Sequence, residues 1–287
     1  MTRLYWKNRN VYWRLMRADK PIGIYLLLWP TLWALFLAAE GIPQISHLII
    51  FVLGVILMRS AGCVINDFAD RKVDGHVERT AERPLAKKEI TSQEALLLFA
   101  LLIAICFVLV LFLNWHTILL SFVALFLASL YPFMKRYTHF PQVVLGAAFG
   151  WSIPMAAMAV LNTVPVWAWV LFAANLAWTV AYDTYYAMVD RDDDILIGVK
   201  STAIAFGKYD LWVTWGLQVI AMALLAWVFS QKALNAGAFI LLVIAAAQLV
   251  WHGWTVKDRK KPALFSAFLN NHYVGMTVFA AIVVGLF

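Results

Sequence analysis

The stretch Ala95–Leu113 reads ALLLFALLIAICFVLVLFL and contains no polar residue. About 20 such residues suffice for one helical crossing of the hydrocarbon core of a bilayer, so this stretch predicts a transmembrane helix. The whole chain agrees, since 63% of its 287 residues are hydrophobic, only 14% are charged and the mean hydropathy is +0.78. Soluble domains are about 45–50% apolar and about 25% charged, which excludes a soluble globular protein. The many aromatic residues exclude a disordered one.

Further apolar runs of spanning length occur along the chain. Together with Ala95–Leu113 they predict nine spans, at about 22–40, 45–66, 95–113, 117–133, 141–161, 164–186, 209–230, 236–256 and 268–287. The sequence therefore predicts an all-α integral membrane protein with about nine transmembrane helices. We expect residues 1–21 to form a basic segment before the first span, and residues 22–287 to form a single membrane-embedded domain.

The basic residues are distributed unevenly among the loops. Six precede the first span, namely Arg3, Lys7, Arg9, Arg14, Arg17 and Lys20. If alternate loops lie on opposite sides, all of the 23 Lys and Arg residues except Arg59 and Lys232 share the side of the N-terminus. Basic loops stay in the cytoplasm, so we predict a cytoplasmic N-terminus and cytoplasmic loops at about 67–94 and 187–208. The net charge of +7 then follows from topology and attraction to membrane lipid, and no nucleic-acid partner is predicted.

Arg59 is exceptional because it lies inside the second predicted span. An unpaired charge at membrane depth costs several kcal/mol. We therefore expect Arg59 to face either an anionic partner or an aqueous cavity.

A first acidic cluster directly continues the second span and reads NDFADRKVD from Asn66 to Asp74. On a helix with about 100° per residue, Asn66, Asp70 and Asp74 form one stripe. Carboxylates four residues apart repel each other by a few tenths of a kcal/mol, so the stripe favours a bound cation.

A second acidic cluster emerges from the sixth span and reads YDTYYAMVDRDDD from Tyr182 to Asp194. Helical spacing places Asp183, Asp190 and Asp194 within roughly 20° of one another. Either cluster alone would be explained by a solvated, acidic helix end. The two recur with equal spacing, because Asp190 and Asp194 follow Asp70 and Asp74 by 120 residues each. We interpret them as two similar helix ends that face each other.

Oxygen-rich groups on both sides of a cleft suit Mg²⁺, which takes one or two carboxylates, waters and substrate phosphate oxygens. The pattern therefore predicts a site for a magnesium diphosphate. Cations that could complete it are Lys20, Arg79, Arg83 and Lys135. No glycine-rich P-loop motif occurs, which argues against a nucleotide held in that way.

At these residues the chain resembles the UbiA family of intramembrane aromatic prenyltransferases. The first cluster matches the family motif Asn-Asp-x-x-Asp-x-x-x-Asp, and the second matches Asp-x-x-Tyr-Ala-x-x-Asp-x-x-Asp-Asp. The resemblance extends from Arg17–Gly23 through Tyr131–Lys135 to Gly198–Thr202. The runs RTAERPL (79–85) and YPFMKR (131–136) are most similar to the branch of the family that prenylates 4-hydroxybenzoate.

The resemblance implies a nine-span helical fold with the site at the cytoplasmic side of a central cavity, in a bacterial inner membrane. It implies Mg²⁺-dependent transfer of a polyprenyl group from polyprenyl diphosphate to 4-hydroxybenzoate in ubiquinone biosynthesis. The residues that would bind Mg²⁺ and diphosphate are Asn66, Asp67, Asp70, Asp74, Asp190 and Asp194, with Lys20, Arg79, Arg83 and Lys135 neutralising phosphate. Those that would bind the aromatic acid are Arg59, Asn66, Tyr131 and Arg136. The catalytic carboxylates would be Asp70, Asp74, Asp183, Asp190 and Asp194.

Several alternatives stay open at this point. The base that removes the ring proton could be Asp190, Asp183, another carboxylate of the clusters or diphosphate itself. The acceptor could be homogentisate, dihydroxynaphthoate, haem or a chlorin, which other members of the family use. A transporter is the main alternative from another class, because charges within spans often mark ion pathways. The concentration of the acidic residues at one face argues against it.

Overall fold

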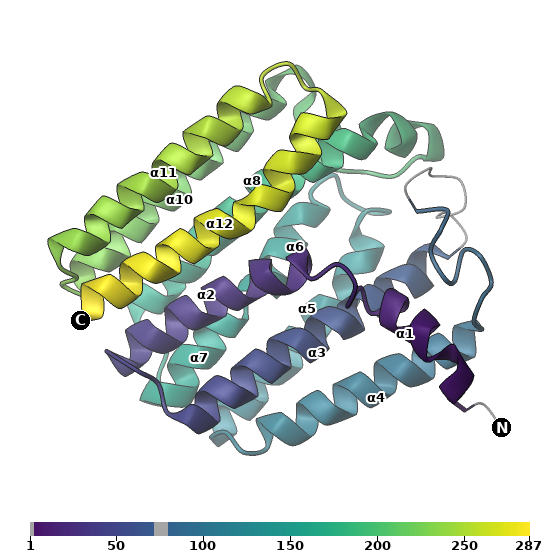
Figure 1. Ribbon diagram of the computed structural model, residues 1–287, viewed down its shortest axis with the longest axis horizontal. Coiled ribbons are helices and arrows are strands. Elements are labelled where there is room, and N and C mark those ends of the chain that lie inside the picture. The colour runs from purple at the N-terminus through teal and green to yellow at the C-terminus, as the bar shows by residue number, and fades with distance from the viewer. Residues whose placement is uncertain (1–2, 72–79) are drawn as a thin grey trace.

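The computed structural model describes residues 3–71 and 80–287, and this part of the chain is helical and contains no β-strand (Figure 1). Its elements are η1 (Trp6–Asn8), α1 (Arg9–Leu15), α2 (Ile22–Ala39), α3 (Ile45–Asp70), α4 (Ser92–Val110), α5 (Trp115–Met134), α6 (Pro141–Gly150), α7 (Ser152–Leu161), α8 (Val166–Ile197), α9 (Thr202–Phe206), η3 (Gly207–Tyr209), α10 (Asp210–Gln231), α11 (Ala236–Thr255) and α12 (Lys261–Leu286). The predicted all-α architecture is confirmed.

The membrane-spanning helices match the predicted runs closely. Within the described ranges, eight segments are long and apolar enough to cross a bilayer, and the 32-residue α8 corresponds to the remaining predicted run. The fifth run is divided between α6 and α7, which meet at Trp151. The largest differences from the predicted boundaries are at α8, which continues to Ile197, and at α12, which begins at Lys261. The end of α8 extends past its apolar residues into acidic sequence, where hydropathy no longer indicates the helix end, and α12 begins with the mixed stretch Lys261–Ala267.

The length of α8 determines where the second acidic cluster lies. The helix ends where Gly198 adopts a left-handed conformation, with φ +72°, and the Gly198 N–H bonds to the carbonyl of Ile195. Glycine favours this position because it carries no Cβ that would clash. Asp183, Asp190 and Asp194 therefore belong to one continuous helix, as the spacing predicted.

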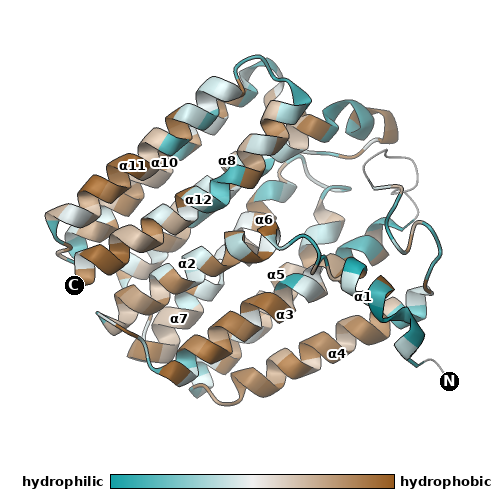
Figure 2. Ribbon diagram, in the orientation of Figure 1, coloured by the Kyte–Doolittle hydropathy of each residue, from teal (hydrophilic) through white to brown (hydrophobic). Residues whose placement is uncertain are grey.

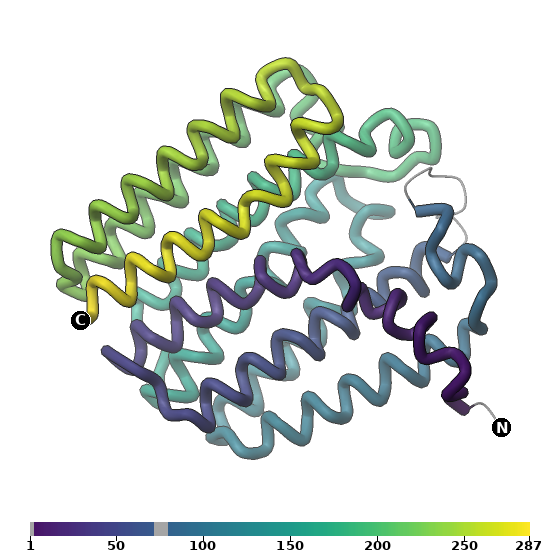
Figure 3. The backbone as a smooth tube through the Cα atoms, in the orientation of Figure 1, coloured from purple at the N-terminus to yellow at the C-terminus, as the bar shows by residue number. Residues whose placement is uncertain are grey.

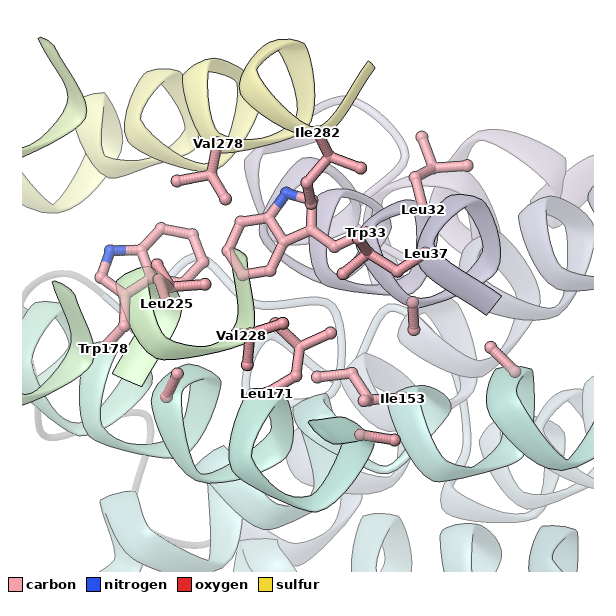
Figure 4. Close-up of a cluster of buried hydrophobic side chains, with 14 of the residues drawn as sticks. Leu32, Trp33, Leu37, Ile153, Leu171, Trp178, Leu225, Val228, Val278 and Ile282 are labelled. Carbon is pink, nitrogen blue, oxygen red and sulfur yellow. The ribbon is translucent and has the colours of Figure 1, made fainter. Parts of the chain in front are cut away.

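Two tryptophans fix α8 against α2 and α12 (Figure 4). The rings of Trp33 and Trp178 lie 5.5 Å apart, centroid to centroid. Trp33 Nε1 donates to the carbonyl of Gly275 at 3.0 Å, and Trp178 Nε1 donates to Asn271 Oδ1 at 2.9 Å. Gly275 permits this contact, since a Cβ there would lie 2.9 Å from the Trp178 ring. Satisfied indole N–H groups in a buried cluster hold the three helices in one relative position.

Polar residues gather at one end of the bundle. Figure 2 shows hydrophilic residues in α1 and in the loops around the ends of α3 and α8, whereas α4 is hydrophobic along its length. The backbone path in Figure 3 takes the N-terminal segment across the ends of α3 and α4. There Tyr12 and Leu15 of α1 pack with Val64, Ala95 and Leu98. The polar end of the bundle contains the described residues of both acidic clusters.

Candidate functional site

A cavity of about 880 Å³ opens at the polar end of the bundle and continues into its interior. Most of the residues singled out from the sequence line it: Lys20, Arg59, Asn66, Asp67, Asp70, Arg83, Tyr131, Lys135, Asp183, Asp190 and Asp194. Lys20 precedes α2, Arg83 precedes α4 and Lys135 follows α5. The other residues belong to α3, α5 and α8. Asp74 and Arg79, which were also predicted, lie outside the described residues. The structure thus brings two distant acidic motifs to one space.

Asp70 is the last residue of α3 and is almost fully buried, with 1% of its surface exposed. Its carboxylate accepts a hydrogen bond from Lys135 Nζ, and its Oδ1 atom has no hydrogen-bond partner. Arg136 also lies near Asp70: its exposed side chain donates to the Ala69 carbonyl at 2.5 Å, and its Nη2 atom lies 3.9 Å from Asp70 Oδ1. Arg136 is not among the residues that line the cavity.

Asp67 is equally buried and is held by two arginines. Its Oδ1 atom lies 3.1 Å from Arg17 Nη2 and 3.2 Å from Arg83 Nη1, while its Oδ2 atom has no hydrogen-bond partner. Arg17 was assigned no place in the site from the sequence. The one sequence feature that could have pointed to Arg17 is its position at the start of Arg17–Gly23, a run that resembles the UbiA family. Its backbone adopts a left-handed conformation with φ +56°, which is uncommon for a residue other than glycine.

The N-terminal segment is attached to the bundle through Glu94, a buried residue near the start of α4. Glu94 Oε1 accepts hydrogen bonds from Asn8 Nδ2 and from the Tyr12 hydroxyl, each at 2.9 Å. Burial raises the pKa of the Tyr12 hydroxyl above its usual value, so the hydroxyl remains a donor at neutral pH. This attachment positions the residues that follow α1, so that Arg17 and Lys20 reach the cavity.

The second acidic cluster presents one face of α8 to the cavity. Asp183 is buried, and Asp190 and Asp194 are half-buried; all three line the cavity. Asp192 points elsewhere and pairs with Lys261 at 3.2 Å. The helical spacing inferred from the sequence therefore separates the lining carboxylates from Asp192.

A buried ion-pair cluster lies just behind this face, and sequence reasoning missed it. Asp210, the first residue of α10, is fully buried and accepts hydrogen bonds from Arg191 and from Arg259, whose Nη2 atom lies 2.7 Å from Asp210 Oδ1. Arg191 is the neighbour of Asp190 on α8, and Arg259 precedes α12. Asp210 thus joins three elements next to the second acidic cluster.

Arg59 lies farther from the mouth of the cavity than Asp70, with the two backbones about 16 Å apart along α3 at about 1.5 Å per residue, and its side chain extends back towards the mouth. Its Nη1 atom lies 2.7 Å from Cys63 Sγ, and its guanidinium carbon lies 5.9 Å from the centre of the Phe149 ring. Its buried Nε atom has no hydrogen-bond partner, and no described carboxylate lies within 4.0 Å of it. The cavity is therefore the environment of this cation, one of the two alternatives expected for Arg59.

Beyond Arg59 the cavity wall becomes apolar. The lining residues in this part come from α3, α4 and α5 and include Phe51, Val55, Cys106, Phe107, Phe122 and Leu125. Such a surface suits a hydrocarbon chain, because its burial releases water from apolar surface. Among the described residues, acidic and basic side chains line the mouth of the cavity, Arg59 lies farther in, and an apolar extension follows.

The donor atoms at the mouth fit a hard divalent cation. Asn66, Asp70, Asp190 and Asp194 offer oxygen atoms, and the buried Oδ1 of Asp70 has no hydrogen-bond partner. In residues 3–71 and 80–287, no three His, Cys, Asp or Glu side chains converge closely enough to hold an ion by themselves. An ion here would complete its coordination with waters and substrate phosphate, as Mg²⁺ prefers.

Comparisons with known proteins agree with this fold. The model of the UbiA prenyltransferase family matches residues 27–279. The chain is 57% identical to proteins named 4-hydroxybenzoate octaprenyltransferase from Pseudomonas syringae pv. tomato, covering 94% of this chain and 91% of that one, and from Pasteurella multocida, covering 96% and 95%. An apo UbiA homologue from Aeropyrum pernix K1 superposes with a TM-score of 0.81 at 27% identity, covering 92% of this chain and 98% of that one. This chain is a member of the UbiA prenyltransferase family.

Proposed function

We propose that this protein transfers a polyprenyl group from polyprenyl diphosphate to the ring carbon of 4-hydroxybenzoate ortho to the hydroxyl, in ubiquinone biosynthesis. The observation that carries the proposal is the convergence of two acidic helix ends, several cations and, deeper, Arg59 on one cavity with an apolar extension. Relatives with 57% identity that are named 4-hydroxybenzoate octaprenyltransferase support the choice of both substrates.

The substrates are placed by charge and polarity. The diphosphate lies at the mouth of the cavity, where Asn66, Asp70, Asp190 and Asp194 hold Mg²⁺, with Asp74 as a further ligand outside the described residues. Lys20, Arg83 and Lys135 neutralise phosphate charge, and Asp67 orients Arg83. The prenyl chain follows the apolar wall. The acceptor lies between, with its carboxylate on Arg59 and its ring near Tyr131 and Asn66.

The reaction begins with cleavage of the bond between the allylic carbon and the diphosphate oxygen, whose electron pair leaves with the diphosphate. Bound Mg²⁺ supplies positive charge that stabilises this leaving group. Lys135 shifts from Asp70 towards the phosphate as charge develops there. The ortho carbon of the phenol then forms the new carbon–carbon bond, and Asp190 accepts the ring proton, with Asp183 as the alternative acceptor. The apolar walls exclude water from the allylic cation, and the faces of aromatic side chains stabilise it.

We further propose a location in the bacterial inner membrane with the N-terminus and the mouth of the cavity on the cytoplasmic side. The concentration of basic residues at the polar end of the bundle supports this orientation. A water-soluble acid and the diphosphate group would then both reach the site from the cytoplasm. In this arrangement residues 22–287 form one membrane-embedded prenyltransferase domain.

Metal removal tests the proposed reaction. Purified protein in detergent is incubated with 4-hydroxybenzoate and polyprenyl diphosphate, in Mg²⁺ or in excess EDTA, and the prenylated product is measured by mass spectrometry. We expect product only with Mg²⁺, restored when Mg²⁺ is added back to the EDTA sample. Folded protein that forms no product from 4-hydroxybenzoate in Mg²⁺ would overturn the proposed acceptor, and homogentisate and dihydroxynaphthoate would then be assayed as acceptors.

Arg59→Met tests the position of the acceptor. Loss of a charge-assisted hydrogen bond to a carboxylate costs about 1.5–3 kcal/mol, so we expect KM for 4-hydroxybenzoate to rise about 10- to 150-fold. KM for polyprenyl diphosphate should change much less, because in the proposed arrangement the diphosphate binds at the acidic helix ends and not at Arg59. The uncharged analogue 4-hydroxybenzamide serves as the matched substrate, and its KM should change little. Equal increases for the acid and the amide would show that Arg59 does not bind the carboxylate.

A further inference from the structure

Gly23, near the start of α2, lies against the guanidinium group of Arg59. A Cβ atom built on Gly23 would lie 2.1 Å from Arg59 Nε, 2.6 Å from Nη2 and 2.7 Å from the guanidinium carbon. Real Cβ contacts are never this short, so any side chain at position 23 must move the guanidinium. The backbone of Gly23 is helical and needs no glycine conformation. The glycine is therefore explained by space for Arg59 and not by backbone geometry.

Other glycines on the cavity wall differ from Gly23. Gly54 and Gly62, which line the cavity from α3, have no atom within 4 Å of an added Cβ. The contact of Gly23 is thus particular to this position and is not a general property of a small-residue wall. It places the guanidinium between the α2 backbone at Gly23, the thiol of Cys63 and the ring of Phe149.

We propose that Gly23 is a positioning residue that determines specificity for an aromatic carboxylic acid, because it leaves the space in which the Arg59 guanidinium lies. The inference rests on the proposed function, in which Arg59 binds the acceptor carboxylate. Arg59 Nη1 is engaged by Cys63 and its Nε is buried, so contact with Gly23 fixes the direction in which the remaining N–H groups point. A methyl group at position 23 turns them away from the acceptor.

The proposal is tested with Gly23→Ala, alone and combined with Arg59→Met. Alanine favours helix more than glycine, so the substitution does not weaken α2 itself. We expect Gly23→Ala to raise KM for 4-hydroxybenzoate about tenfold or more, by loss of a charge-assisted contact. KM for 4-hydroxybenzamide and KM for polyprenyl diphosphate should stay within about twofold of the wild-type values, which is roughly the deviation expected for a substitution that does not act on their binding. Gly216→Ala in α10, where an added Cβ meets nothing within 4 Å, is the control.

The double variant separates positioning from general damage. If Gly23 acts through Arg59, Gly23→Ala adds no further increase in KM for the acid once Arg59 is methionine. Independent, multiplying effects would overturn the inference, as would an unchanged KM for the acid in Gly23→Ala while Arg59→Met is impaired. If Arg59→Met itself binds the acid normally, the assignment of Arg59 in the proposed function fails. The two failures are therefore distinguishable.

Discussion

Asp190→Asn is expected to lower kcat on the order of 1,000-fold while the protein remains folded in the membrane, because it removes a preorganised charge at the reacting centre. The side chain is half-buried and lines the cavity, and asparagine has nearly the same shape. Turnover is measured in saturating Mg²⁺ and both substrates, and folding is monitored by size-exclusion chromatography in detergent. Asp70→Asn is expected to act similarly, since Asp70 is the corresponding carboxylate of α3.

Asp192→Asn is the matched control for this experiment. Asp192 lies two residues along the same helix but pairs with Lys261 at 3.2 Å, and three quarters of its side chain is exposed. We expect its turnover to remain close to that of the unchanged protein. A similar loss of turnover in Asp190→Asn and Asp192→Asn would mean that turnover depends on the net charge of the helix end. It would not then depend on which face of α8 carries the carboxylate. Near-normal turnover of Asp190→Asn would remove Asp190 from the site.

Asp210→Ala is expected to lower the free energy of unfolding by about 2–3 kcal/mol and to reduce turnover as well. Removing one partner of a buried ion pair leaves the other charge uncompensated, at a cost of about 3–5 kcal/mol when both are buried. The cost is smaller here, because the side chains of Arg191 and Arg259 are 23% and 40% exposed. Turnover falls because Arg191 no longer holds the end of α8 that carries Asp190. Thermal unfolding in detergent and kcat are the measurements.

Asp258→Ala provides the comparison for Asp210→Ala. Asp258 adjoins Arg259 in the same loop and is exposed, so its removal changes the charge near the cluster without opening a buried pair. We expect its unfolding temperature and kcat to match those of the unchanged protein. An Asp210→Ala variant with unchanged unfolding temperature would show that the cluster does not hold the three elements together.

Local sequence patterns predicted much of this protein. Apolar runs such as Ala95–Leu113 predict spanning segments by their length alone, although length did not reveal the division of the fifth run between α6 and α7. The stripes in the two acidic clusters could also be predicted from neighbouring residues alone, because helical periodicity decides which carboxylates share a face. Asp183, Asp190 and Asp194 accordingly lie on one side of α8, with Asp192 on another. The equal spacing of the two clusters then led to the interpretation that these two helix ends face each other.

The missed features depend on residues far apart in the chain. Arg17 meets Asp67 across 50 positions, and Arg259 meets Asp210 across 49. No periodicity links such pairs, so Arg17 and Arg259 were interpreted only as signals of topology, Asp210 was left without a role, and Asp67 was assigned to the magnesium site without its arginine partners. Packing also sets the surroundings of Arg136, whose side chain donates to the Ala69 carbonyl and lies 3.9 Å from Asp70 Oδ1, while its predicted contact with the aromatic acid stays a prediction. Which neighbour of a charge becomes its partner is decided by packing.

The attachment of Tyr12 to Glu94 also bears on how the chain is assembled during synthesis. The two residues are separated by 82 positions, so Tyr12 leaves the ribosome well before its acceptor exists. A nascent chain that has inserted only α2 and α3 already carries Arg17 and Asp67, but it lacks the docking point that brings the N-terminal segment across the bundle. The mouth of the cavity is therefore completed only after α4 has begun to form. Arg17 can therefore take its docked place beside Asp67 only once the start of α4 has been translated, whereas Arg83, which also contacts Asp67, precedes α4 in the chain.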